Sequence, residues 1–167
     1  WIPESWDFHP STPYATSRAA GDWHVANMAK IKEIPAVFTR AANVYGPGQQ
    51  LYRVIPRAFL SGMVGEPFPL HGVGDSTRSF IHIRDVCEAT YLLAEGDFDE
   101  KVFHISTNEL VSIRSLVGTI GEMMSSEYSL DIVSLPERAG KDLTYQLDSS
   151  LLRGRTGWSD KVSLEAG

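Results

Sequence analysis

A tyrosine and an arginine four residues apart form the first pair in this sequence that could do chemistry. They are Tyr14 and Arg18, within the stretch "STPYATSRAAGDW" (11–23). On a helix, side chains at i and i+4 are neighbours, and a fixed cation beside a phenol favours the phenolate. Such a pair can exchange a proton with a substrate hydroxyl. The spacing alone is a weak indication, because similar pairs are common on solvated helix surfaces.

The residues around this pair predict the helix that would hold it. Pro13 suits a first helical turn and Ser11 or Thr12 suits its cap, so we expect a helix over 13–31. The stretch "IPAVFTRAANVYGPG" (34–48) then predicts a short strand over 36–40, followed by a loop rich in glycine and proline.

The rest of the chain alternates between helical and extended segments. We expect helices over 53–64, from Asp85 as N-cap to about Glu95, from Ser112 as N-cap to about Met124, and a short last one ending near Gly157, and extended segments over 68–71, 79–83, 101–107 and 130–136. This alternation predicts an α/β protein with parallel strand pairing.

Composition and charge narrow the class of protein. Of 167 residues, 43% are hydrophobic and 22% charged, as in an ordinary globular domain. The net charge of −6 opposes a general nucleic-acid or anionic-membrane surface, although it leaves room for a local basic pocket that binds phosphate. No apolar run is long enough to cross a membrane. Cys87 is the single cysteine, so we expect a reducing, cytoplasmic location.

Five stretches, in order, resemble the extended short-chain dehydrogenase/reductases, in particular the NAD-dependent nucleotide-sugar epimerases and dehydratases. They are "PYATSRAAGD" (13–22), "TRAANVYGPGQQ" (39–50), "RVIP" (53–56), "FPLHGVGDSTRSFIHIRDV" (68–86) and "LPERAGKDLTYQLDSSLLRGRTGW" (135–158). The resemblance covers nearly the whole chain and is nearest to the subgroup of dTDP-glucose 4,6-dehydratases.

The resemblance implies the C-terminal part of a Rossmann-type NAD(P)-binding fold plus a small α/β substrate-binding region. Residues 1–47 would end the cofactor domain, and 48–167 would mainly bind substrate, with 86–107 returning to the Rossmann sheet. No G-x-x-G-x-x-G phosphate loop follows a first strand here. We therefore expect a piece of a longer protein, inactive by itself; the alternative is a complete processed domain.

The same resemblance assigns Tyr14 and Arg18 to both catalysis and cofactor binding. Tyr14 is placed as the general acid/base. Arg18 stands where the family usually has a lysine that touches the nicotinamide ribose. Arginine keeps the positive charge, but its planar guanidinium is larger and directs its donors differently.

Further residues are assigned to the nucleotide sugar. Asn43 is placed at the diphosphate, Arg78 at a phosphate, and Phe68, Leu70 and His71 around the base, with Arg53, Arg138 and Asp142 as additional contacts. Plainer roles stay open: Arg78 as a solvated loop residue, Asn43 as a turn-former, and Arg53 as a packing residue between loop and helix.

The implied reaction is a transient oxidation at the sugar C4. Bound NAD, with NADP as an alternative, would take the hydride while Tyr14 takes the hydroxyl proton. Dehydration (a lyase reaction), epimerisation (an isomerase reaction) or decarboxylation would follow, in a homodimeric enzyme. The alternatives are an inactive nucleotide-sugar binding module and a structural fragment.

His82 and His104 lack metal-ligand spacing and are expected to be core or edge residues.

Overall fold

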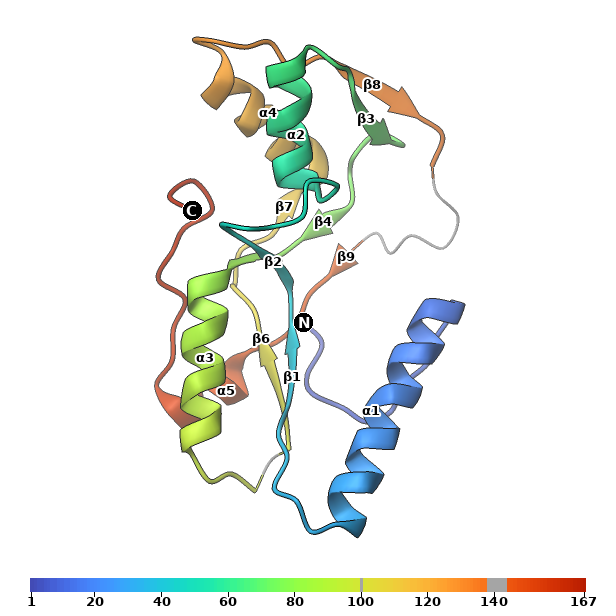
Figure 1. The fold of residues 1–167 in the computed structure, drawn as a ribbon, viewed down its shortest axis with the longest axis vertical. Helices are drawn as coiled ribbons and strands as arrows, with labels where there is room; N and C mark the ends of the chain where they lie inside the picture. Colours follow the sequence, from blue (N-terminus) through green and yellow to red (C-terminus); the bar gives the residue numbers. More distant parts are fainter. Residues whose placement is uncertain (100, 138–143) are drawn as a thin grey trace.

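The computed structural model describes residues 1–99, 101–137 and 144–167. Its lower half, as seen in Figure 1, is built on two parallel strands, β1 (Phe38–Ala41) and β6 (Val102–Ile105). Helix α1 (Pro13–Ile31) lies on one side of this pair, and α3 (Ile83–Glu95) and α5 (Ser150–Thr156) lie on the other.

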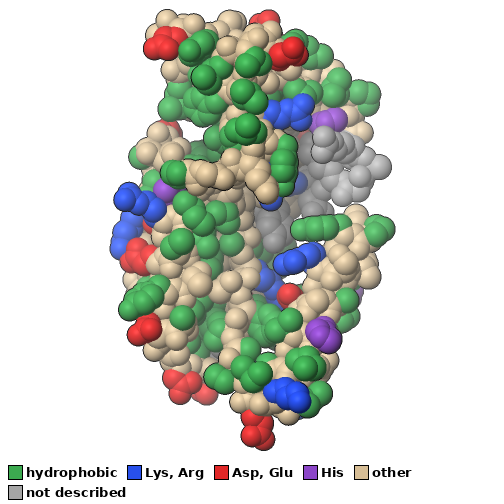
Figure 2. Space-filling model, viewed as in Figure 1, with side chains coloured by type: hydrophobic (Ala, Val, Ile, Leu, Met, Phe, Trp, Pro, Cys, Tyr) green, Lys and Arg blue, Asp and Glu red, His purple; other side chains and the backbone are tan. Residues whose placement is uncertain are grey.

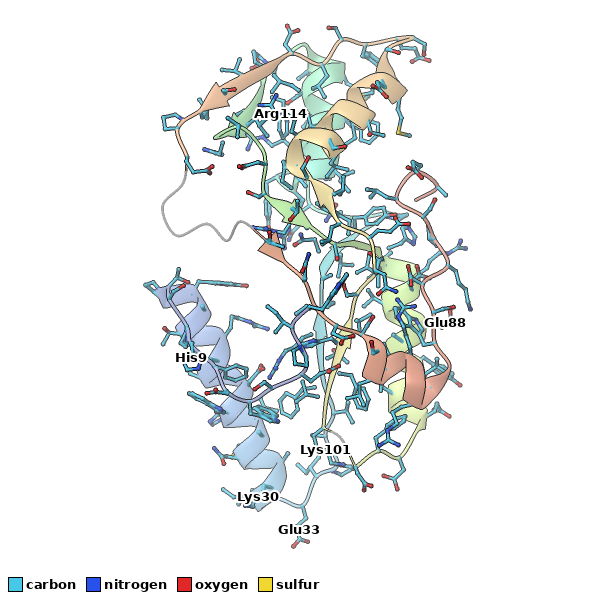
Figure 3. The ribbon with its side chains drawn as sticks, turned by 180° about the vertical axis from the view of Figure 1, so that it is seen from behind. His9, Lys30, Glu33, Glu88, Lys101 and Arg114 are labelled. Carbon is cyan, nitrogen blue, oxygen red and sulfur yellow. The ribbon has the colours of Figure 1, made fainter. Side chains whose placement is uncertain are left out.

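The upper half holds a second strand pair with two helices. Strand β3 (Phe68–His71) pairs in parallel with β8 (Ile132–Leu135), while α2 (Val54–Val64) packs against α4 (Ile113–Met124). Arg114, labelled in Figure 3, lies in the first turn of α4 and donates from Nε to the Val73 carbonyl at 2.5 Å, which ties this helix to the turn after β3.

Short strands join the two halves. Strand β2 (Asn43–Tyr45) pairs in parallel with β5 (Phe80–His82). Strand β4 (Thr77–Arg78) lies between β7 (Val111–Ser112), which is antiparallel to it, and β9 (Thr144–Tyr145), which is parallel. These pairings bring 43–45, 77–82, 111–112 and 144–145 together at the middle of the molecule.

Each half has its own hydrophobic core. The upper core consists of Tyr45, Ala58, Phe68, Leu70, Phe80, Leu116, Val117, Ile120 and Met124. The lower core consists of Ala42, Ile81, Ala89, Leu93, Phe103, Ile105, Leu152 and Trp158. Burial of these apolar side chains holds the helices onto the strands. The α/β class and the parallel pairing predicted from the sequence are confirmed.

Two helix starts agree with the sequence prediction. The hydroxyl of Thr12 accepts from the backbone N–H of Ala15 at 3.1 Å and caps α1. The hydroxyl of Ser112 accepts from the N–H of Ser115 at 3.0 Å and caps α4. Each bond satisfies a backbone donor that the first helical turn leaves free.

The predicted cap at Asp85 is wrong. Helix α3 begins at Ile83, and the ring of His82 caps it by accepting from the N–H of Arg84 at 3.3 Å. Asp85 is buried in the first turn, where its carboxylate accepts from the N–H of Val162 at 3.1 Å. The carboxylate therefore holds the C-terminal segment rather than its own helix.

No helix within the described ranges has both the length and the hydropathy that a bilayer-spanning segment needs.

Candidate functional site

A cavity of about 670 Å³ opens where β2, the start of α2, β3 and β4 meet. It is lined by six of the residues that the resemblance assigned to the nucleotide sugar: Asn43, Arg53, Phe68, Leu70, His71 and Arg78. These residues come from separate segments of the chain, so only the fold brings them to one place.

The cavity has an apolar wall and a basic wall. Phe68, Leu70 and Phe80 are buried and present apolar surface. Arg53 and Arg78 contribute positive charge, together with Arg57, and the described part of the lining contains no acidic side chain. A planar aromatic group suits the first wall and a phosphate suits the second. The local charge is thus opposite to the net charge of −6.

Arg57 is a cavity residue that the sequence analysis missed. It lies on α2 one turn after Arg53, the residue just before that helix. The i, i+4 spacing of two arginines at a helix start was visible in the sequence and could have indicated a shared anion-binding face.

Short strands fix the polar residues of the cavity. Asn43 begins β2 and is half-buried, and its backbone N–H donates to the Ser79 carbonyl at 3.1 Å. Arg78 ends β4 and donates from Nη1 to the Thr77 carbonyl at 2.7 Å. Because their backbones belong to paired strands, both side chains start from fixed positions.

His71 lies at the end of β3, at the edge of the cavity. Its Nδ1 is 3.2 Å from the Pro136 carbonyl, next to the paired strand β8. The chain then turns through Gly72 and Gly74, whose φ angles of 63° and 73° favour glycine. After this turn the chain continues into β4, whose Arg78 lines the same cavity as His71.

Tyr14 and Arg18 do not line this cavity. Tyr14 is on the first turn of α1 and is 74% exposed. Arg18 is exposed one turn later and lines a smaller cavity of about 370 Å³, together with Asp22 of α1 and residues 36–39. The structure therefore separates the predicted catalytic pair from the predicted substrate residues. Arg138 and Asp142 lie outside the described residues.

Tyr45, the tyrosine of the "VYGPG" loop, is no candidate acid/base. It is 4% exposed and its hydroxyl donates to the Ser163 carbonyl at 3.0 Å. Burial raises its pKa above the ordinary value, and the nearby carboxylates of Asp85, Glu165 and Glu109 raise it further. Its phenol therefore stays protonated and has a structural partner.

The two histidines that the sequence analysis considered are buried. His82 caps α3, and its ring packs edge-on against Tyr45 at 5.3 Å between centroids. His104 lies on β6, and burial lowers its pKa. Among the described residues, no group of His, Cys, Asp and Glu is arranged to hold a metal ion.

A second large cavity, of about 790 Å³, lies between α2 and α4 and is bordered by residues 164–167. Its lining is mostly apolar and includes Phe59, Met63 and Met123. Figure 2 shows hydrophobic side chains gathered over this upper part of the molecule. None of the residues assigned from the sequence lines this cavity.

Parallel strand pairs with helices on both sides define an α/β protein of the Rossmann type. The chain belongs to the NAD dependent epimerase/dehydratase family, whose model matches residues 3–106. It is also 30% identical over 171 residues to the dTDP-glucose 4,6-dehydratase of Streptomyces niveus, covering 99% of this chain and 51% of that relative.

Solved structures agree with this relationship. The dTDP-glucose 4,6-dehydratase DesIV of Streptomyces venezuelae, solved with NAD bound, matches 99% of this chain with a TM-score of 0.91 and 27% identity. A UDP-glucose 4-epimerase of Thermotoga maritima, solved with UDP-glucose, matches 95% with a TM-score of 0.86 and 29% identity. This chain covers 51% and 52% of those two proteins, so it spans about half their length.

Proposed function

We propose that this chain is the part of an NAD-dependent nucleotide-sugar 4,6-dehydratase or epimerase that binds the nucleotide sugar and carries the catalytic tyrosine. A single observation carries the proposal: six residues assigned to the nucleotide sugar on sequence alone line one cavity with an apolar and a basic wall. The relatives reported above are named as dehydratases and an epimerase, which favours an enzyme over an inactive binding module or a structural fragment.

The cavity would hold the nucleotide part of the substrate. The base would lie against Phe68 and Leu70, while Arg78 and Arg53 would pair with the phosphates, since a guanidinium donates two parallel hydrogen bonds to phosphate oxygens. Asn43 would add an amide donor at the diphosphate. Residues 48–167 are thus proposed as mainly substrate-binding.

Tyr14 and Arg18 fit the nicotinamide end of NAD. Both are exposed on α1 at i, i+4 spacing, and in the described ranges no acidic side chain pairs with Arg18. NAD, when bound, would accept a hydride from the sugar C4 and return it. Tyr14 would take the proton of the sugar hydroxyl, and the donors of Arg18 would contact the ribose. NADP is the alternative cofactor.

The same proposal includes assembly and location. We propose a homodimer, supported by the exposed apolar side chains Trp23, Val25 and Met28 along α1. A cytoplasmic location is supported by the single cysteine, which suits a reducing compartment. Residues 1–47 and 86–107 are proposed to belong to the cofactor domain, because β1 and β6 pair in parallel.

Calorimetric titration of the 167-residue chain with UDP and dTDP tests the substrate part. We expect binding of at least one nucleoside diphosphate, weakened by Arg78→Met, since a hydrogen bond to a charged group contributes about 1.5–3 kcal/mol. Arg84→Met is the matched control: it removes the same charge from an exposed position on α3. No binding of either diphosphate, or equal binding by Arg78→Met, would contradict the proposal.

A further inference from the structure

Arg40 connects three parts of the molecule near the predicted catalytic helix. It lies on β1, and its Nε and Nη2 donate to Oδ2 of Asp22 on α1 at 3.3 and 3.1 Å. Its Nη1 donates to the Ser5 carbonyl at 2.6 Å. The side chains of this ion pair are only 20% and 28% exposed, so water screens it less than a surface pair.

Aromatic rings hold the Arg40 guanidinium in place. It lies 5.4 Å from the ring centroid of Trp6 and 4.6 Å from that of Phe8. Trp6 in turn packs edge-on against Phe38 of β1, and Phe8 packs against Trp23 of α1. Figure 3, in which Lys30 marks the end of α1, shows aromatic side chains between this helix and the strands.

Asp22 has a second cation within reach on its own helix. Arg18 precedes it by four residues, and both line the same cavity of about 370 Å³. Residues at this spacing are neighbours that attract when oppositely charged. Even so, no hydrogen bond or ion pair joins the Arg18 side chain to another residue in the part of the chain that the structure describes, while Oδ2 of Asp22 is engaged by Arg40.

We propose that Arg40 is a positioning residue for Arg18: by neutralising Asp22, it prevents an ion pair between Asp22 and Arg18 and leaves the Arg18 guanidinium available to a ligand. Tyr14, Arg18 and Asp22 follow one another at intervals of four along α1. An ion pair with Asp22 would draw Arg18 away from Tyr14, towards the C-terminal end of the helix. Arg40 therefore determines whether the Arg18 guanidinium lies near Tyr14 or pairs with Asp22.

The importance of a free Arg18 guanidinium rests on the proposed function. The accessibility of that guanidinium can be measured whether or not the proposed function is correct. Phenylglyoxal modifies accessible guanidinium groups, and peptide mapping by mass spectrometry gives the rate at Arg18 in the 167-residue chain without cofactor or substrate. We expect Arg40→Met to slow modification of Arg18 by about twofold, the effect of an i, i+4 ion pair on a helix. Adding Asp22→Asn to Arg40→Met should restore the original rate.

This rescue separates positioning from a purely structural role. If Arg40 only ties α1 to the sheet, the double variant loses that tie as fully as the single one, and Arg18 reacts equally in both. An Arg18 rate in Arg40→Met equal to or above that of the unsubstituted chain overturns the proposal, and so does a slowed rate that Asp22→Asn fails to restore.

Two variants keep the test decisive if Arg40→Met does not fold. Asp22→Asn alone should leave the Arg18 rate unchanged, and a faster rate would show that Asp22 already pairs with Arg18, which overturns the proposal. Arg153→Met is the matched control: Arg153 also pairs with an aspartate, Asp160, at 2.5 Å and lies over a ring, Trp158, at 4.9 Å. Its loss should leave Arg18 unchanged, and a slower Arg18 there would overturn the assignment to Arg40.

Discussion

The indole Nε1 of Trp158 donates to the backbone carbonyl of Asp85 at 3.0 Å, although 73 residues separate them. Trp158 is 3% exposed and belongs to the lower core. The Asp85 carboxylate holds Val162, and Glu88, labelled in Figure 3, pairs with Lys161 at 2.5 Å. Residues 158–162 are therefore fastened to α3 by three separate contacts.

Loss of the indole N–H should destabilise the fold. Trp158→Phe removes the indole hydrogen bond to the Asp85 carbonyl and part of a packed ring, so we expect the free energy of unfolding to fall by about 1–3 kcal/mol. Urea denaturation followed by circular dichroism measures this. Trp1→Phe is the control, because Trp1 is 54% exposed, and it should change stability by less than about 0.5 kcal/mol. Equal effects of the two substitutions would contradict the role of this hydrogen bond.

Stability should depend on pH through His104. Burial lowers its pKa in the folded chain; Arg40 acts in the same direction, whereas Glu4 and the carbonyls of Ile2 and Asp148 oppose the shift. The unfolded chain therefore takes up a proton that the folded chain does not, once the pH falls below the ordinary histidine pKa of 6.5.

The free energy of unfolding should consequently drop as the pH is lowered from 7 to 5, by up to about 1.4 kcal/mol per pH unit, and the urea midpoint should drop with it. His104→Asn should make this dependence shallower, while His24→Asn, which changes an exposed histidine on α1, should leave it as it is. A midpoint whose pH dependence is the same with and without His104 would show that this histidine is not responsible.

Removal of one hydroxyl tests the acid/base assignment. In the whole enzyme, Tyr14→Phe should lower kcat by about 10²–10⁴-fold, the usual contribution of a general acid/base, while nucleotide binding persists. Tyr91→Phe is the control: Tyr91 is 64% exposed on α3. The rate of 4-keto sugar formation measures turnover. An unchanged rate in Tyr14→Phe would remove Tyr14 from the mechanism.

The charge at residue 18 should matter more than its shape. Arg18→Lys keeps the positive charge and should retain activity. Arg18→Met should lower kcat/KM by about tenfold or more, because a hydrogen bond to a charged group contributes about 1.5–3 kcal/mol. Complete loss of activity in Arg18→Lys would mean instead that the site is built specifically around a guanidinium.

The 167-residue chain alone should not turn over a nucleotide sugar. Its sequence has no glycine-rich phosphate loop after a first strand, and it spans about half the length of its relatives. Incubation with NAD and dTDP-glucose or UDP-glucose, analysed by chromatography, measures this. NAD-dependent conversion by the purified chain would contradict the expectation.

The sequence by itself determined the features that depend on neighbouring residues. Thr12 and Pro13 start α1, Ser112 starts α4, and the glycines after His71 make the turn, because capping and φ preferences act over a few residues. The ordered motifs also picked out six residues that line the cavity of about 670 Å³, although the resemblance did not show how these residues come together.

Only the tertiary structure decided the long-range partners. The sequence suggested Asp85 as a helix cap, but the fold buries it against a segment 77 residues away. Asp22 likewise forms its ion pair with Arg40 on β1 rather than with Arg18, which precedes it by four residues on α1. A carboxylate can serve several donors with similar energy, so its partner depends on which donor the packed strands and rings hold beside it. Sequence spacing cannot show that choice, because it is made by burial and by the positions of residues far apart along the chain.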